Sequence, residues 1–246
     1  MPNHSKRILM DNPTLSPKSL QIVEKILSKN DKKANELREI YAHGNLYVIN
    51  LMSSPGSGKT TLLESLAKYS EQADIMMRFC VIEGDLQTNR DADRLEHCGI
   101  AAHQILTGAA CHLEAAMVED AYNALKARNA LDVEYLFIEN VGNLVCPASY
   151  DLGAHLNLVL LSSAEGDDKV LKYPSMFLCA DAVIISKADL CEVFDFSIDK
   201  VRADLAQLKP NIPIFLTSSK DITSLHELVR FLAESKKMGY HSTHCF

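Results

Sequence analysis

The chain has 246 residues, of which 47% are hydrophobic and 23% are charged, and its net charge is −7 at pH 7. This composition excludes a disordered or fibrous protein, and the negative charge argues against a nucleic-acid partner. No apolar run approaches the ~18 residues of a membrane span, and the polar N-terminus lacks a signal sequence. We therefore expect a cytoplasmic protein whose seven cysteines are thiols.

The first 44 residues form a predicted helical extension ahead of a main domain at 45–246. Ser16-Pro17 is typical of a helix start, and Gly44 of its end. The apolar residues between them recur at helical spacing, which predicts one or two helices packed on the main domain. They are Leu20, Val23, Leu27, Ala34, Leu37 and Tyr41.

Short apolar runs alternate with helical patterns through the rest of the chain. This alternation predicts an α/β fold in which a mostly parallel sheet is flanked by helices. The predicted strands are 46–52, 79–82, 101–106, 135–138, 156–161, 182–185 and 212–216, and the predicted helices include 61–68, 112–128, 198–208 and 224–235.

A phosphate-binding loop lies between the first predicted strand and the first helix of the main domain. The sequence Ser53-Ser-Pro-Gly-Ser-Gly-Lys-Thr60 has the P-loop spacing, except that Ser53 replaces the first glycine. Its backbone N–H groups face an anion, Lys59 reaches the β- and γ-phosphates, and the Thr60 hydroxyl holds Mg²⁺. The predicted nucleotide contacts here are Ser54, Pro55, Gly56, Ser57, Gly58, Lys59, Thr60 and Thr61.

Acidic residues follow two later strands, at the sheet edge where parallel strands bind ligands. Asp85 follows the second strand and is predicted to bind Mg²⁺ or to orient the attacking water. Glu139 follows the fourth strand, and Gly142 comes three residues later, as in a segment that senses the γ-phosphate. Together with Lys59, these two carboxylates are our candidate catalytic residues. Asp91 and Asp93 are interpreted instead as carboxylates of a helix N-terminus.

Two tetrads at the last strand ends indicate guanine rather than adenine. Ser186-Lys-Ala-Asp189 matches Asn-Lys-x-Asp with Ser in place of Asn, so we expect one brace of the site to be lost. Asp189 would accept from the guanine N1–H and 2-amino groups, while the Lys187 stem covers the base. Thr217-Ser-Ser-Lys220 follows the next strand, and Ser219 and Lys220 are predicted to contact the base.

Cysteine and histidine near these loops suggest a metal site. Cys111 and His112 are predicted to open a helix, where a thiol is acidified, and Cys146 follows the γ-phosphate-sensing segment. Sulfur and imidazole ligands suit Ni²⁺ or Zn²⁺. From spacing alone a purely structural Cys-His pair remains open, and a twofold dimer would be needed to complete the ligand set.

Taken together, these motifs resemble the HypB family of GTPases, which insert nickel during [NiFe]-hydrogenase maturation. The resemblance spans about 46–220, and its most specific segments are Glu83–Arg94, Thr107–Glu114 and Glu139–Pro147. It implies GTP hydrolysis with Mg²⁺ and a homodimer that depends on GTP and metal. It also implies a nickel or zinc site at Cys111, His112 and Cys146. The implied partners are a HypA-like nickel chaperone and a hydrogenase large subunit, with urease as a possible second client.

Three alternatives stay open. A urease-accessory GTPase would carry Cys-Pro-His, whereas Ala148 follows Cys146-Pro147 here. A deviant P-loop ATPase would carry a lysine near the start of the loop, where this chain has Met52 and Ser53. The third is a nickel or zinc carrier that uses GTP only as a structural switch.

Overall fold

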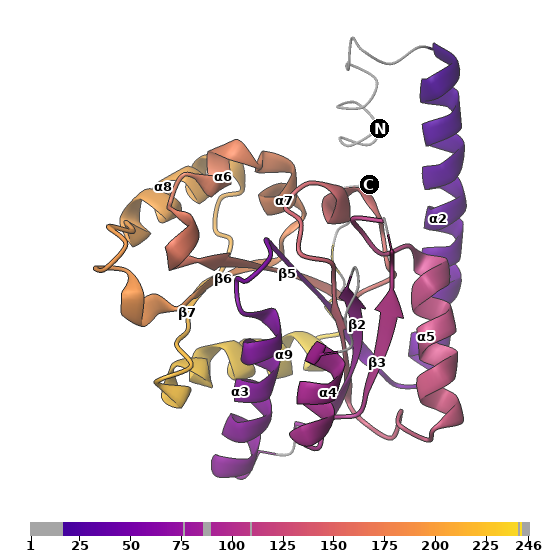
Figure 1. Cartoon of the computed structure of the whole chain (residues 1–246), viewed down its shortest axis with the longest axis horizontal. Helices are drawn as coiled ribbons and strands as arrows, with labels where there is room; N and C mark the ends of the chain where they lie inside the picture. The colour runs from indigo at the N-terminus through magenta and orange to yellow at the C-terminus, as the bar shows by residue number, and fades with distance from the viewer. Residues whose placement is uncertain (1–16, 76, 86–89, 109, 241, 243–246) are drawn as a thin grey trace.

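The computed structural model describes residues 17–75, 77–85, 90–108, 110–240 and 242. Within them seven strands form one sheet in the order β3-β2-β4-β1-β5-β6-β7, and every pairing is parallel (Figure 1). The strands are β1 (Tyr47–Ser53), β2 (Phe79–Asp85), β3 (Ala102–Leu106), β4 (Tyr135–Glu139), β5 (Leu156–Ser162), β6 (Ala182–Ser186) and β7 (Ile214–Leu216).

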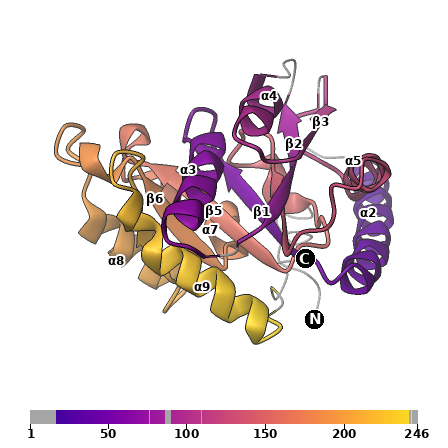
Figure 2. The same cartoon turned by 90° about the horizontal axis from the view of Figure 1, so that it is seen from below.

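Helices cover both faces of this sheet. They are α2 (Pro17–His43), α3 (Lys59–Gln72), α4 (Arg90–His97), α5 (Ala115–Ala127), α6 (Lys169–Lys172), α7 (Pro174–Cys179), α8 (Ile198–Leu208) and α9 (His226–Lys237). On one face α3, α4 and α9 pack on a shared apolar core. On the other face α2 and α5 pack on one half of the sheet, and α6, α7 and α8 pack on the other half (Figure 2).

The strands form where the sequence carries short apolar runs. All seven residues of β1 and of β5 are buried, as expected for central parallel strands with helices on both faces. The predicted α/β fold is therefore confirmed, with strand boundaries that differ from the prediction by three residues at most. The short α6 and α7 were not predicted, because a segment with Pro174 inside it carries no sustained helical period.

The predicted N-terminal extension contains α2 in its described part, and its first sixteen residues lie outside the described part of the chain. This helix lies beside α5 in both views (Figures 1 and 2). Ala34, Leu37 and Tyr41 of α2 are fully buried there. The domain boundary at residue 44 stays a prediction. No helix in the described part combines the length and apolar character needed to cross a membrane.

The order of the strands places β1 at the centre, between β4 and β5. From β1 the chain passes to β2 on one side of the sheet, and after β4 it crosses β1 to reach β5 on the other side. The carboxyl ends of β1, β4 and β5 therefore border a switch point of the sheet. Ligands bind at such points in parallel α/β sheets. The loops that follow β1, β2, β3, β4, β6 and β7 carry the predicted site residues.

Candidate functional site

The phosphate loop has the conformation that the sequence predicted. Between the end of β1 at Ser53 and the start of α3 at Lys59, Gly56 and Gly58 adopt left-handed backbone angles, with φ of 74° and 97°. Glycine takes these angles without the strain that a Cβ would add. The turn and the first residues of α3 thus form the concave N-terminus at which an anion binds.

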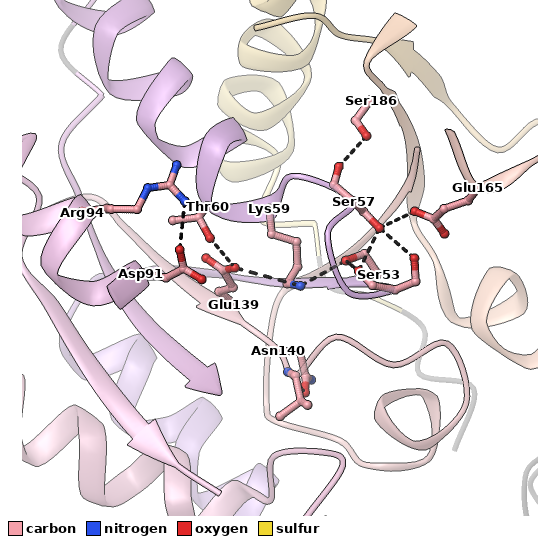
Figure 3. Close-up of polar contacts among 12 residues, drawn as sticks. Ser53, Ser57, Lys59, Thr60, Asp91, Arg94, Glu139, Asn140, Glu165 and Ser186 are labelled. Atoms are coloured by element: carbon pink, nitrogen blue, oxygen red, sulfur yellow. Dashed lines mark hydrogen bonds and ion pairs between the residues drawn. The ribbon is translucent and has the colours of Figure 1, made fainter. Parts of the chain in front are cut away.

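Lys59 is held inside this loop, with its side chain 8% exposed. Its Nζ donates to Ser53 Oγ at 3.1 Å and lies 4.0 Å from Glu139 Oε1 (Figure 3). Ser53, which replaces the usual glycine, is fully buried and also donates to the Ser54 carbonyl. The serine is therefore accommodated, and its hydroxyl supplies an acceptor for the lysine.

A pocket of about 180 Å³ beside the loop is lined by carboxylates from β2, β4 and α4. The parallel register pairs Glu83 with Glu139, and Asp85 and Asp91 line the same pocket. Thr60 Oγ1 donates to Glu139 Oε1 at 2.9 Å. The structure thus brings together Lys59, Thr60, Asp85 and Glu139 as the sequence predicted.

Asp91 lies in the first turn of α4, where the sequence placed it, and its Oδ1 accepts from Arg94 at 2.9 Å (Figure 3). Arg94 also pairs with Glu64 of α3 at 2.9 Å. Asp91 therefore lies in the N-terminal turn of α4, where its negative charge is favourable, and it also lines the acidic pocket.

Two of the carboxyl groups in this pocket have raised pKa values. Burial, together with the nearby Glu139 and Asp85 carboxylates, raises the pKa of Glu83 to about 9. Burial raises the pKa of Glu139 to about 7, although the Lys59 ammonium and the Thr60 hydrogen bond act in the opposite direction. Burial favours the neutral form of a carboxyl group because the anion loses its hydration.

The donor set of this pocket fits Mg²⁺. Hard oxygen ligands are those that Mg²⁺ prefers, and Thr60, Asp85 and Glu139 supply them next to the phosphate loop. Glu83 Oε2 and Glu139 Oε2 are buried and have no hydrogen-bond partner among the described residues. Buried carboxylate oxygens in that state indicate a site that a cation, or water around it, would complete.

A second cavity, of about 260 Å³, lies between the loops after β6 and β7. It is lined by Lys187, Asp189, Ser219 and Lys220, the predicted base contacts, together with Thr61 and Gly58 of the phosphate-loop region. Asp189 accepts from Ser218 Oγ at 2.6 Å and pairs with Lys220 Nζ at 3.0 Å. These hydrogen bonds lower the pKa of Asp189, so its carboxylate is available as an anionic acceptor.

We expected that serine in place of asparagine at position 186 would lose a hydrogen bond that supports the site, and this expectation is wrong. Ser186 Oγ donates to the Ser57 carbonyl at 2.7 Å, and Lys187 Nζ donates to the Gly56 carbonyl at 2.9 Å. The serine hydroxyl is short, but β6 ends close enough to the phosphate loop for it to reach. The loop after β6 therefore holds the phosphate loop directly.

Sequence reasoning missed Glu165, which follows β5. Its Oε1 accepts from Ser57 Oγ at 2.5 Å and from the Ser162 backbone N–H at 3.3 Å, within a capping box (Figure 3). Ser57 is thus held from both β5 and β6. The position of Glu165 could have indicated its role, because β5 ends at the same sheet edge as the strands that carry the predicted site residues.

The three predicted metal ligands are brought together. One ligand atom from each of Cys111, His112 and Cys146 lies within 4.8 Å of the other two. The two Sγ atoms are 2.8 Å apart, and Cys111 Sγ lies 3.8 Å from His112 Nδ1. Ligand atoms about 2.0–2.3 Å from one tetrahedral ion lie roughly 3.3–3.8 Å apart, so the sulfur–nitrogen spacing is close to that of a bound ion and the two sulfurs would have to separate. We call these three residues the thiol-imidazole cluster.

The predicted helix start at Cys111 is wrong, because α5 begins at Ala115. The cysteine and histidine lie in the turn before it, so no helix N-terminus acts on them directly. Burial and the hydrogen bond from Cys111 raise the pKa of Cys146 to about 11. A bound cation would reverse this preference, since metal ligation stabilises the thiolate.

Tyr150 was also missed. Its ring stacks on the His112 imidazole, with 3.8 Å between centroids and 18° between planes. Burial lowers the pKa of His112, so the neutral form that binds metals is favoured. His112 Nε2 is buried and has no hydrogen-bond partner among the described residues.

A short segment joins the cluster to the phosphate loop. A Cβ on Gly142 would lie 2.8 Å from Pro55 Cα, so only glycine allows this close approach. The next residue, Asn143, donates its backbone N–H to the Ser53 carbonyl at 2.8 Å. Its side-chain oxygen accepts from the Cys146 backbone N–H at 3.3 Å. The nucleotide loop and Cys146 are therefore linked by two successive contacts.

Comparison with known proteins agrees with this geometry. The family described as "CobW/HypB/UreG, nucleotide-binding domain" matches residues 47–216. The hydrogenase/urease maturation factor HypB of Helicobacter pylori strain J99 is 60% identical over 247 aligned positions, which cover 100% of both chains. The hydrogenase maturation factor HypB of Escherichia coli strain K12 is 41% identical over 222 residues, covering 89% of this chain and 74% of that protein.

Solved structures of HypB proteins are also similar to this chain. The crystal structure of HypB from Helicobacter pylori in complex with nickel has a TM-score of 0.85 and 61% identity, covering 89% of this chain and 100% of that chain. The crystal structure of the hydrogenase maturation factor HypB from Archaeoglobus fulgidus has a TM-score of 0.75 and 34% identity, covering 85% and 100%.

The raised pKa of Glu83 predicts a pH-dependent stability of the nucleotide-free protein. Between its ordinary pKa of 4.5 and about 9, the folded chain keeps a proton that the unfolded chain releases. Stability therefore falls as pH rises through this window. Glu83→Gln should flatten the decline and be more stable than wild type at pH 8, by an amount on the order of a few kcal/mol.

Urea unfolding at pH 5.5 and pH 8 measures this effect. Glu234→Gln is the control, because the Glu234 side chain is 61% exposed and its replacement should leave the pH profile as in wild type. Parallel pH profiles for Glu83→Gln and wild type would contradict the assignment.

Proposed function

The chain belongs to the HypB members of the CobW/HypB/UreG family, and we propose that it is a GTPase that delivers nickel during [NiFe]-hydrogenase maturation. The observation that carries the proposal is the contact chain from the phosphate loop through Gly142 and Asn143 to Cys146. A nucleotide site and a thiol-imidazole cluster joined in this way suit a protein that holds a soft metal and changes state with its nucleotide.

Guanine is the base that the second cavity suits best. The Asp189 carboxylate accepts from adjacent N–H donors, which guanine presents and adenine does not. Lys187 and Ser186 hold the phosphate loop from the same segment, so base and phosphate sites are coupled through a short stretch of chain.

Hydrolysis needs the γ-phosphate to be positioned and its charge stabilised. Lys59 would leave Ser53 and Glu139 and pair with the β- and γ-phosphates. Thr60, Asp85 and Glu139 would hold Mg²⁺, which supplies charge stabilisation when bound. The Asp85 and Glu139 carboxylates, which line the same pocket, are also the candidates to orient the attacking water.

Nickel is the cargo rather than a resident cofactor in this proposal. Cys111, His112 and Cys146 supply two sulfur ligands and one nitrogen ligand, a set that suits Ni²⁺ and also Zn²⁺. Three ligands from one chain leave room for more from a second copy, so we propose a homodimer that depends on GTP and metal. Its proposed partners are a HypA-like nickel chaperone and a hydrogenase large subunit, with urease as a second client.

Two alternatives are less well supported. A urease-accessory GTPase would need a histidine where Ala148 follows Cys146-Pro147. A carrier that uses GTP only as a structural ligand would not need the buried Lys59 and Glu139 pair beside the phosphate loop. Measured turnover separates the carrier from the enzyme.

Replacing Lys59 tests the hydrolytic role. Lys59→Ala should reduce GTP turnover by roughly 100-fold or more and weaken nucleotide binding, because it removes the cation beside the transferred phosphate. Phosphate release under saturating GTP is the measurement. Lys68→Ala, at an exposed position on the same helix, should behave as wild type. Normal turnover in Lys59→Ala would refute the assignment of the phosphate loop.

Replacing Asp189 tests the base. Asp189→Asn should weaken GTP binding by roughly 10- to 100-fold, since hydrogen bonds to charged groups contribute about 1.5–3 kcal/mol. Xanthosine triphosphate should gain affinity, because the amide can donate to its 2-oxo group. Competition against a fluorescent guanine nucleotide measures both effects. Equal displacement by ATP and GTP in the wild type would rule out guanine selectivity.

Nickel titration tests the link between the two sites. Wild type, Cys111→Ala, His112→Ala and Cys146→Ala are each titrated with GDP and with a non-hydrolysable GTP analogue. Cys111→Ala should lose the site in both states, whereas Cys146→Ala should chiefly lose the nucleotide dependence. By linkage, nickel must change GTP affinity by the same factor as GTP changes nickel affinity. A wild type that binds nickel equally with both nucleotides would show that the sites are uncoupled.

A further inference from the structure

Asn30 of α2 is buried, with 6% of its surface exposed, although it lies in the helix that precedes the nucleotide-binding domain. Its Oδ1 accepts from the Ala115 backbone N–H at 2.9 Å, and its Nδ2 donates to the Asp151 carbonyl at 2.8 Å. Both ends of the amide are therefore used, and each contacts a segment at least 85 residues away.

The first of these segments carries Cys111 and His112. Ala115 is the first residue of α5, and the N-cap residue Glu114 makes no side-chain cap hydrogen bond. The first N–H groups of a helix have no partner within it. Asn30 supplies one from another helix, and so holds the start of α5 three residues after His112.

The second segment carries Cys146 and Tyr150. Asp151 follows Tyr150 directly, and its carboxylate accepts from Arg38 of α2 at 2.6 Å and from the Gly153 backbone N–H at 2.8 Å. Helix α2 lies close to this segment, because a Cβ on Gly153 would be 2.7 Å from the Ala34 carbonyl oxygen. The segment has little freedom to move away from α2.

One side chain thus connects the two segments that supply the thiol-imidazole cluster. We propose that Asn30 is a positioning residue for this cluster: its amide fixes the distance between the Cys111–His112 turn and the Cys146–Tyr150 turn. The N-terminal helix is then part of the metal site, although it contributes no ligand. This inference rests on the proposed nickel-binding role of the cluster.

Loss of a group that orients metal ligands typically lowers metal affinity 10- to 100-fold. Asn30→Ala should therefore weaken Ni²⁺ binding by about tenfold or more. It should also alter the thiolate-to-nickel charge-transfer absorption, since the two sulfurs are no longer held at a fixed separation. General loss of stability would leave the absorption spectrum of the folded fraction unchanged.

Two further variants make the test specific. Lys33→Ala removes another contact of α2, the 2.9 Å ion pair with Glu119 of α5, without touching either ligand segment. It should bind nickel with the affinity and spectrum of wild type. Asn30→Asp keeps the acceptor for Ala115 and loses the donor to Asp151. It should fold if Asn30→Ala does not, and should show the altered spectrum.

The measurement is titration of the full chain with Ni²⁺ alone, followed by near-ultraviolet absorption and by competition with a chromophoric chelator. Circular dichroism establishes that each variant is folded. Wild-type affinity and spectrum in both Asn30 variants would overturn the inference. So would equal weakening in Lys33→Ala. If Cys111→Ala binds nickel as well as wild type, the proposed function has failed instead, and the two failures are thereby distinguished.

Discussion

The close approach of Gly142 to the phosphate loop is the contact on which both sites depend. With no Cβ at this position, the segment after β4 lies directly against Pro55, and Asn143 forms a backbone hydrogen bond to Ser53. Any other residue at 142 would push the two apart, since overpacking at a backbone contact cannot be relieved by a side-chain rotation. Because the chain continues from there to Cys146, the phosphate loop and the thiol-imidazole cluster are separated by only a few residues of chain.

The buried pocket beside the phosphate loop contains more carboxyl groups than cations. Lys59 faces Glu139, while Glu83 lies near the Glu139 and Asp85 carboxylates and has a strongly raised pKa. Ionisation of all the carboxyl groups of this pocket is therefore electrostatically unfavourable. Binding of GTP with a divalent cation would relieve it, so ligand binding is coupled to the protonation state of the pocket. Functional sites often combine such perturbed groups in one cleft.

The phosphate loop and the thiol-imidazole cluster are held in place by different parts of the fold. Ser57 in the phosphate loop is held from β5 by Glu165 and from β6 by Ser186, so the sheet itself fixes the loop. The thiol-imidazole cluster lies on turns instead, and those turns are held by α2.

The sequence alone determined the fold and most of the site, because period, strand-end position and loop spacing are local properties. It predicted the parallel sheet, the phosphate loop, Asp189 and the three residues of the cluster. Tertiary structure decided which groups meet across the chain. The reach of Ser186 to Ser57, the role of Glu165 and the two hydrogen bonds of Asn30 depend on distances between segments far apart in sequence. The start of α5 also needed the structure, since its cap comes from α2 rather than from a neighbouring residue.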